Sequence, residues 1–193
     1  GSADSVERVF RTSGTTEGGE GRGEHHVRDL EIYRHALAPN FRAYLLPEGE
    51  TLPILALLSS PAESPDSSLS FMMEEMAGEG SGFFFHPVEG IRKEAFHQAL
   101  KEAEEAGGAI LLAGTAFSFV NWIEISEREG WSFHLPPGTR IMETGGYKGR
   151  SASLPKDTLY EAISEHFGVA QRRIVNEYGM TELLSQFYEP VLV

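Results

Sequence analysis

Short apolar segments of strand length alternate with amphipathic helical segments along most of this sequence. Residues 53–58 and 109–113 are continuous apolar runs of the kind found in strands covered on both faces. Between them, residues 91–106 carry their apolar side chains on one helical stripe, and Gly107 follows where a helix commonly ends. Strands that alternate with single helices form mostly parallel sheets. The sequence therefore predicts an α/β fold with a mostly parallel sheet and crossover helices.

The same alternation continues through the remainder of the chain. Further strands are predicted at residues 5–12, 83–86, 139–143 and 173–176. Further helices are predicted from Val27 to a stop at Pro39-Asn40, at residues 69–76, from a turn at Gly114 to about Arg128, and at residues 155–167 with Gly168 as the closing residue. No repeat or long linker interrupts the pattern. Residues 1–193 are therefore predicted to form a single α/β domain.

Composition and charge exclude several classes of protein. Lys and Arg number 16 and Asp and Glu 29, and this net charge of −13 argues against a nucleic-acid or acidic membrane surface as partner. No apolar run approaches the roughly 20 residues that cross a bilayer. The absence of cysteine excludes disulfides, thiolate metal sites and a cysteine nucleophile, and favours a cytoplasmic location. An anionic ligand must therefore be held locally.

A segment rich in glycine and hydroxyl groups follows the first predicted strand. It reads Thr12-Ser13-Gly14-Thr15-Thr16-Glu17-Gly18-Gly19. Glycines let backbone N–H groups converge on a phosphate, and the hydroxyls donate further hydrogen bonds. A flexible surface loop accounts for the same composition. The Gly-Lys-Ser/Thr ending of a P-loop is absent, so that class of nucleotide site is excluded.

Two further segments lie directly after predicted strands, where ligands of parallel sheets bind. Asn176-Glu177-Tyr178-Gly179-Met180-Thr181-Glu182 offers a flat aromatic face, a hydroxyl and a hard carboxylate ligand for magnesium. Residues 143–150 contain Gly145-Gly146, which lets a planar ring lie against the backbone, and then Lys148 and Arg150. Residues 178–182 and Gly145-Gly146 are also explained as plain turns.

Other chemistry-bearing residues have structural explanations that compete with a functional one. Phe117, Phe119, Val120 and Trp122 either line a pocket or, as is more common for aromatic residues at helical spacing, belong to the core. His25-His26 lacks a suitably spaced partner residue for metal binding, so we expect a solvated or phosphate-facing pair.

Together and in this order, the three segments resemble the adenylate-forming superfamily of acyl- and aryl-CoA ligases, luciferases and peptide-synthetase adenylation domains. Residues 12–18 resemble its Ser/Thr/Gly phosphate loop, and Gly145-Gly146 resembles its adenine-side glycines. Tyr178-Gly179-Met180-Thr181-Glu182 resembles its Tyr-Gly-x-Thr-Glu motif. Residues 143–150 and 176–188 look closer still to the acyl-protein synthetases, the fatty-acid-activating subunits of the bacterial luminescence fatty acid reductase. The likeness extends from Thr12 to Tyr188.

The resemblance implies a two-step reaction in which a carboxylate attacks the α-phosphate of ATP, expels pyrophosphate, and is then passed as an acyl group to a thiol. The implied partners are ATP, magnesium, a fatty or other hydrophobic carboxylic acid, and a protein cysteine or coenzyme A. The implied catalytic residues are Thr181 and Glu182, with Glu182 as the metal ligand. The implied nucleotide-binding residues are Thr12, Ser13, Gly14, Thr15, Thr16, Gly145, Gly146, Asn176, Tyr178 and Gly179.

The resemblance also implies that residues 1–193 are the central part of the large N-terminal domain, without its N-terminal part and the C-terminal lid domain. Glu17 stands where the superfamily usually has glycine, and the loop lysine is missing, so phosphate binding should be weakened. The superfamily's ribose-binding aspartate and catalytic lysine lie in later segments that residues 1–193 do not contain, so we expect this chain alone to be weak or inactive. The alternatives are an aryl-CoA ligase of the phenylacetate-CoA ligase type, or a degenerate nucleotide-binding or assembly module. An exposed sheet edge also makes a homo-oligomer an expectation.

Overall fold

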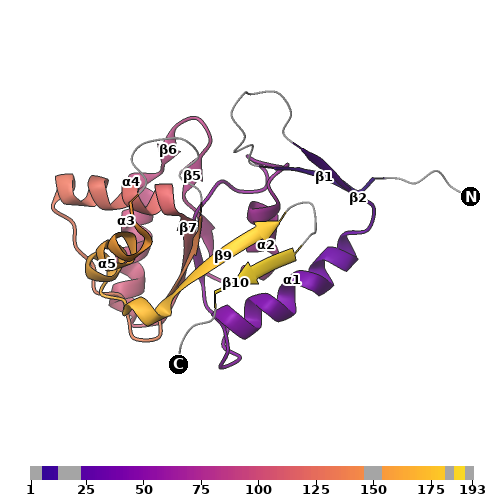
Figure 1. Ribbon diagram of the computed structural model, residues 1–193. Helices are drawn as coiled ribbons and strands as arrows, with labels where there is room; N and C mark the ends of the chain where they lie inside the picture. Colours follow the sequence, from indigo (N-terminus) through magenta and orange to yellow (C-terminus); the bar gives the residue numbers. More distant parts are fainter. Residues whose placement is uncertain (1–5, 13–22, 146–153, 181–184, 190–193) are drawn as a thin grey trace, which may run out of the picture.

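A six-stranded sheet runs through the centre of the computed structural model, which describes residues 6–12, 23–145, 154–180 and 185–189 (Figure 1). The strand order is β10-β9-β8-β7-β3-β4, and every pair is parallel except β9 with β10. The predicted α/β fold with a mostly parallel sheet is confirmed. The strands are β3 (Ile54–Leu57), β4 (Gly82–Phe83), β7 (Leu111–Thr115), β8 (Arg140–Thr144), β9 (Ile174–Met180) and β10 (Ser185–Tyr188).

Helices cover both faces of this sheet (Figure 1). One face packs against α1 (Leu30–Leu45) and α2 (Ser68–Met76). The other packs against α3 (Lys93–Ala106), α4 (Ala116–Glu129) and α5 (Lys156–Phe167). Successive strand residues point to opposite faces, so Leu111 joins the first core cluster and Leu112 the second. Because both faces are covered, β3 is apolar throughout, as the run at residues 53–58 predicted.

Two small antiparallel pairs and one short helix complete the described structure. β1 (Arg8–Arg11) pairs with β2 (Glu24–Val27), and β5 (Phe85–His86) pairs with β6 (Gly90–Ile91). The 3₁₀ helix η1 (Gln171–Arg173) leads into β9. Phe10 of β1 is buried against Tyr33 and Phe71, which fastens this hairpin to the α1 and α2 side of the sheet. Among the described helices, none is long and apolar enough to cross a membrane.

Helices α3 and α5 end at the glycines that the sequence indicated, Gly107 and Gly168. Gly107, Gly130 and Gly168 follow α3, α4 and α5 with φ of 67°, 72° and 68°, a left-handed conformation that glycine adopts without strain. Thr115 begins α4 with a capping box, since its hydroxyl accepts from the N–H of Ser118 at 3.1 Å. This cap fixes the turn between β7 and α4.

The predicted end of α1 at Pro39 is wrong, because the helix continues to Leu45. A proline inside a helix costs about 3 kcal/mol. Tyr33, Leu37, Phe41 and Leu45 are all buried, and burying each large apolar side chain is worth about 1.5–3 kcal/mol. The stripe formed by these four residues therefore outweighs the lost backbone hydrogen bond.

Three predicted strands differ in their bounds. The strand at residues 83–86 is divided: Phe83 pairs with Ala56 of β3, whereas Phe85 pairs with Ile91 of β6. The strand predicted at 109–113 lies two residues later, so Gly114 belongs to β7 rather than to a turn. The strand predicted at 173–176 continues to Met180, because β10 returns antiparallel beside it. The turn predicted at 178–182 is therefore wrong for residues 178–180.

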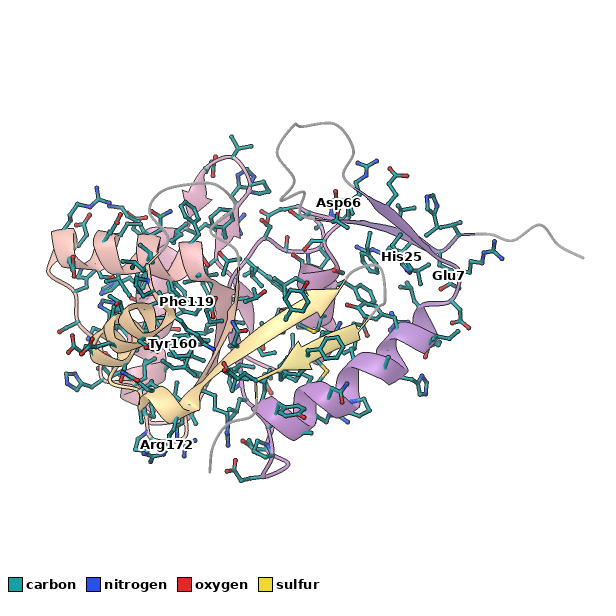
Figure 2. The ribbon with its side chains drawn as sticks, viewed as in Figure 1. Glu7, His25, Asp66, Phe119, Tyr160 and Arg172 are labelled. Atoms are coloured by element: carbon teal, nitrogen blue, oxygen red, sulfur yellow. The ribbon has the colours of Figure 1, made fainter. Side chains whose placement is uncertain are left out.

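The aromatic residues of α4 belong mainly to the core. Phe119 and Trp122 are fully buried, and Trp122 meets Phe96 edge to face with ring centroids 4.7 Å apart. Val120 packs against the same cluster, while Phe117 is partly exposed. Figure 2 shows Phe119 between its helix and the sheet. Of the two explanations that the sequence left open for Phe119 and Trp122, the structural one holds.

Candidate functional site

The carboxyl ends of β7, β8 and β9 lie side by side at one edge of the sheet. In this register Gly114, Glu143 and Asn176 are neighbours across the three strands, and Thr115, Thr144 and Glu177 form the next row. Each row has its side chains on one face of the sheet. The edge is where parallel sheets bind ligands.

Glu143 is the centre of a polar cluster on the α5 side of this edge. Its side chain is only 3% exposed, and its Oε2 accepts from Asn176 Nδ2 at 2.7 Å and from the Tyr160 hydroxyl at 3.3 Å. Tyr160 comes from α5 and lies toward the sheet (Figure 2). Burial raises the pKa of Glu143, and the two hydrogen bonds oppose that rise. The same desolvation raises the pKa of Tyr160.

Glu177 is a second buried carboxyl group, on the opposite face beside α1. It is 2% exposed and hydrogen-bonded to the Thr144 side chain. Burial raises its pKa to about 7, and the charge of Glu143 adds to that rise. Tyr33 and Tyr188 lie near it, and burial together with the Glu177 charge raises the pKa of each phenol. Gln186 Nε2 donates to the Tyr33 hydroxyl at 3.1 Å.

Tyr178 and Phe187 present two exposed aromatic side chains at the same edge. They are direct partners in the β9–β10 ladder and therefore share one face of the sheet. Tyr178 is 62% and Phe187 57% exposed, unlike their buried neighbours Glu177 and Tyr188. Gly145, directly after β8, is also open: a Cβ added there meets nothing within 4 Å. The edge thus offers flat apolar surface beside unobstructed backbone.

Gly179 leaves room for the Glu177 carboxylate. A Cβ at position 179 would stand 2.7 Å from Glu177 Oε1, closer than any real contact. Glycine is therefore required at position 179 because the backbone lies close to the buried Glu177 carboxylate, and not because the chain turns there, as the sequence suggested.

The structure brings only part of the predicted site together. Asn176, Tyr178 and Gly179 lie on β9, next to the strand β8 that Gly145 directly follows. Thr12 directly follows β1 in the β1–β2 hairpin, outside the six-stranded sheet, and its Oγ1 accepts from the Gly23 N–H at 2.9 Å. The predicted residues Ser13, Gly14, Thr15, Thr16, Gly146, Thr181 and Glu182 lie outside the described residues.

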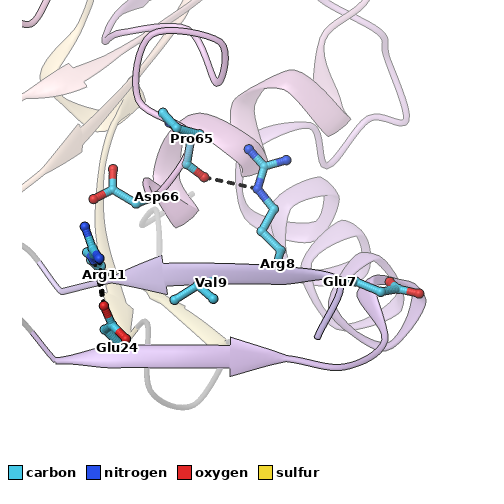
Figure 3. Close-up of a pocket in the computed structure, with 7 residues that line it drawn as sticks. All are labelled: Glu7, Arg8, Val9, Arg11, Glu24, Pro65 and Asp66. Carbon is cyan, nitrogen blue, oxygen red and sulfur yellow. Dashed lines mark hydrogen bonds and ion pairs between the residues drawn. The ribbon is translucent and has the colours of Figure 1, made fainter. Parts of the chain in front are cut away.

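An open hollow lies elsewhere, against the β1–β2 hairpin (Figure 3). Its charged groups bind one another or the backbone: Arg11 Nη2 lies 2.7 Å from Glu24 Oε1, and Arg8 Nε donates to the Pro65 carbonyl at 3.1 Å. The nearby His26 pairs with Glu24 at 3.3 Å and is exposed, as expected for a solvated histidine. Across the described ranges, no group of three or more His, Asp or Glu residues is placed to hold a metal ion.

Sequence reasoning named Glu143 and Glu177 only as members of longer segments and missed Tyr160 and Gln186. The available signal was a carboxylate inside an otherwise buried strand, as in Ile141-Met142-Glu143. Tyr160 reaches Glu143, and Gln186 reaches Tyr33 on the opposite face, only through tertiary packing. Their partners are separated from them by 17 and 153 residues, so no local pattern identifies them.

No protein-family model and no curated protein matches the chain. Among solved structures, the chain is similar to an open conformation of 2-hydroxyisobutyryl-CoA ligase in complex with 2-HIB-AMP and CoA. That likeness has 14% identity and a TM-score of 0.52, and covers 91% of this chain and 36% of that one. A mutant form of coronafacic acid ligase from Pectobacterium brasiliense is 22% identical with a TM-score of 0.46, over 72% of this chain and 24% of that one.

The first of these likenesses establishes the fold. The chain has a mixed α/β fold similar to part of the 2-hydroxyisobutyryl-CoA ligase structure, and the predicted fold class is confirmed. It spans about a quarter to a third of the length of the two ligases.

Proposed function

We propose that this chain is part of an enzyme that activates a carboxylic acid with ATP as an acyl-adenylate and passes the acyl group to a thiol. Within that class we propose an enzyme similar to acyl-protein synthetases, acting on a fatty or other hydrophobic acid. Residues 1–193 would be the central part of its adenylation domain. The ligase fold supports the class, and the Tyr178-Gly179-Met180-Thr181-Glu182 segment supports the reaction.

The observation that carries the proposal is the placement of Asn176 and Tyr178 on β9, next to the strand β8 that Gly145 directly follows. A purine base needs a flat apolar face and polar groups at its edge. Tyr178 offers such a face, Gly145 leaves the adjoining backbone unobstructed, and Asn176 supplies an amide. These three residues fit an adenine ring, so they would bind and orient the nucleotide.

Magnesium and the phosphates would be held by residues outside the described ranges. A carboxylate such as Glu182 is a hard oxygen ligand of the kind that magnesium prefers. Bound magnesium would supply neutralisation of the phosphate charge. Thr181 and the hydroxyls of Thr15 and Thr16 would donate hydrogen bonds to phosphate oxygens. In a chain with a net charge of −13, such local donors must offset the repulsion of an anionic ligand.

Calorimetric titration of Mg·ATP into this chain tests the proposal. Tyr178→Ala should weaken binding about tenfold or more, because stacking of a base on an aromatic ring is worth about 1–3 kcal/mol. Tyr178→Phe is the matched control, since it keeps the ring, and it should bind within about twofold of the unaltered chain. Tyr178 is exposed, so neither change disturbs the core.

Glu182→Ala should abolish the dependence of ATP binding on magnesium while leaving the fold intact. The proposal fails if the unaltered chain does not bind Mg·ATP at millimolar concentration. It also fails if Tyr178→Ala binds as tightly as Tyr178→Phe, because the nucleotide would then lie away from this edge.

A further inference from the structure

Glu143 occupies a buried position at which an apolar side chain would cost less free energy of desolvation. It occupies a buried position in β8 between Met142 and Thr144, and its neighbours along the same face of the sheet include the apolar Ile141. A buried carboxyl group loses its hydration, and it is retained only where hydrogen bonds replace the lost water. Asn176 and Tyr160 both donate to its Oε2. These two bonds explain how the acid is tolerated, and they connect it to the proposed nucleotide edge.

The Asn176 amide group is held by two acceptors of β8. Its Nδ2 donates to Glu143 Oε2 at 2.7 Å and lies 3.3 Å from the Glu143 carbonyl oxygen. Reversing the amide would put its oxygen against these two acceptor oxygens, which repel it. The NH₂ group is therefore committed to β8, and the amide oxygen remains as the acceptor that Asn176 can offer to a ligand.

The surroundings of Glu143 favour this arrangement. Tyr160 donates from α5, and the Lys156 ammonium lies 5.3 Å from the centre of the Tyr160 ring. Lys156 is itself paired with Glu189, which follows β10. The positive charge of Lys156 lowers the pKa of Glu143 and the negative charge of Glu189 raises it, while burial dominates. Among the described residues, no cation binds the Glu143 carboxylate directly, so Asn176 is its closest polar partner.

We propose that Glu143 is a positioning residue that fixes the orientation of the Asn176 amide and thereby selects a nucleobase carrying an amino group. The inference rests on the proposed function. Adenine presents a 6-amino donor, which the amide oxygen accepts, whereas hypoxanthine presents an oxygen at the same position. Glu143 itself touches no ligand and acts through Asn176.

Glu143→Gln tests this role at nearly constant size. A glutamine can accept from the Asn176 NH₂ group or donate to its oxygen, so it stabilises both orientations. Inosine triphosphate (ITP) carries hypoxanthine in place of adenine. The ratio of Mg·ATP to Mg·ITP affinity, measured by calorimetry, should fall about fivefold, which corresponds to the loss of one hydrogen bond. The melting temperature should stay close to that of the unaltered chain. Glu161→Gln, on the exposed side of α5, is the matched control and should leave the ratio unchanged.

A second measurement needs no ligand. The side-chain NH₂ signals of Asn176 can be assigned in nitrogen-15 spectra by their loss in Asn176→Asp. In the unaltered chain, one of these protons should have the chemical shift of a hydrogen-bonded proton. That chemical shift should change in Glu143→Gln. An unchanged signal, or a retained ATP preference in a folded Glu143→Gln variant, overturns the inference. If the signal shifts but the unaltered chain binds no Mg·ATP, then Glu143 positions Asn176 and the proposed nucleotide function is what fails.

Discussion

Replacing the buried Glu177 with glutamine should make the stability of the chain less dependent on pH. Burial raises the pKa of Glu177 from 4.5 to about 7, so the folded chain holds this proton more tightly than the unfolded chain does. Its contribution to stability is fully present below pH 4.5 and is lost as the pH rises through about 7. The shift of about 2.5 units corresponds to about 3 kcal/mol.

Urea unfolding of both proteins at pH 5, 6, 7 and 8 measures this effect. The free energy of unfolding of Glu177→Gln, relative to the unaltered chain, should rise by about 2.5 kcal/mol between pH 5 and pH 8, because part of the full difference is already lost at pH 5. Glu161→Gln serves as the control for general charge effects, because that carboxyl group is exposed. A difference that stays constant over this range would refute the reasoning, since Glu177 would then titrate alike in both states.

Two further predictions concern packing and backbone geometry. Both Gly168→Ala and Gly107→Ala should lower the free energy of unfolding by about 1–2 kcal/mol, because alanine is strained in the left-handed conformation. Gly168→Ala should cost about 1 kcal/mol more than Gly107→Ala. An added Cβ at Gly168 would come within 3.3 Å of the His134 backbone, whereas at Gly107 it would meet nothing within 4 Å. The midpoints of urea unfolding of the two variants measure this difference. Trp122→Ala should cost about 3–5 kcal/mol, because the indole is fully buried, and thermal melting measures it. A loss of stability below 1 kcal/mol would contradict the assignment of Trp122 to the core.

Elements with strong periodicity and a glycine stop were predictable from the sequence. α3 shows this best, since its apolar stripe and Gly107 define the helix without reference to any neighbour. α1 was predicted too short because Pro39 is a local signal, whereas the burial of Phe41 and Leu45 depends on contacts with distant residues. β9 was predicted too short for a similar reason, because its last residues are strand only by virtue of pairing with β10.

The candidate site was predictable only where a motif marked it. Tyr178 and Gly145 were identified from local sequence, and the fold brings their strands together. The hydrogen bonds of Glu143 could not be predicted, because they depend on the register between β8 and β9 and on the placement of α5. Register is a tertiary property, and a shift of one residue would place Asn176 and Glu143 on opposite faces.

The mixed pairing of the sheet has a consequence for how this chain acquires its structure. The ladders β3–β7, β7–β8 and β8–β9 each join strands separated by a crossover segment that contains a helix. Long connections must be closed before such ladders gain any stability, so they form slowly. The antiparallel pairs β1–β2, β5–β6 and β9–β10 join strands that are consecutive in the chain. We therefore expect the local hairpins to form early, so that β9, which carries Asn176 and Tyr178, pairs with β10 before the central sheet is assembled.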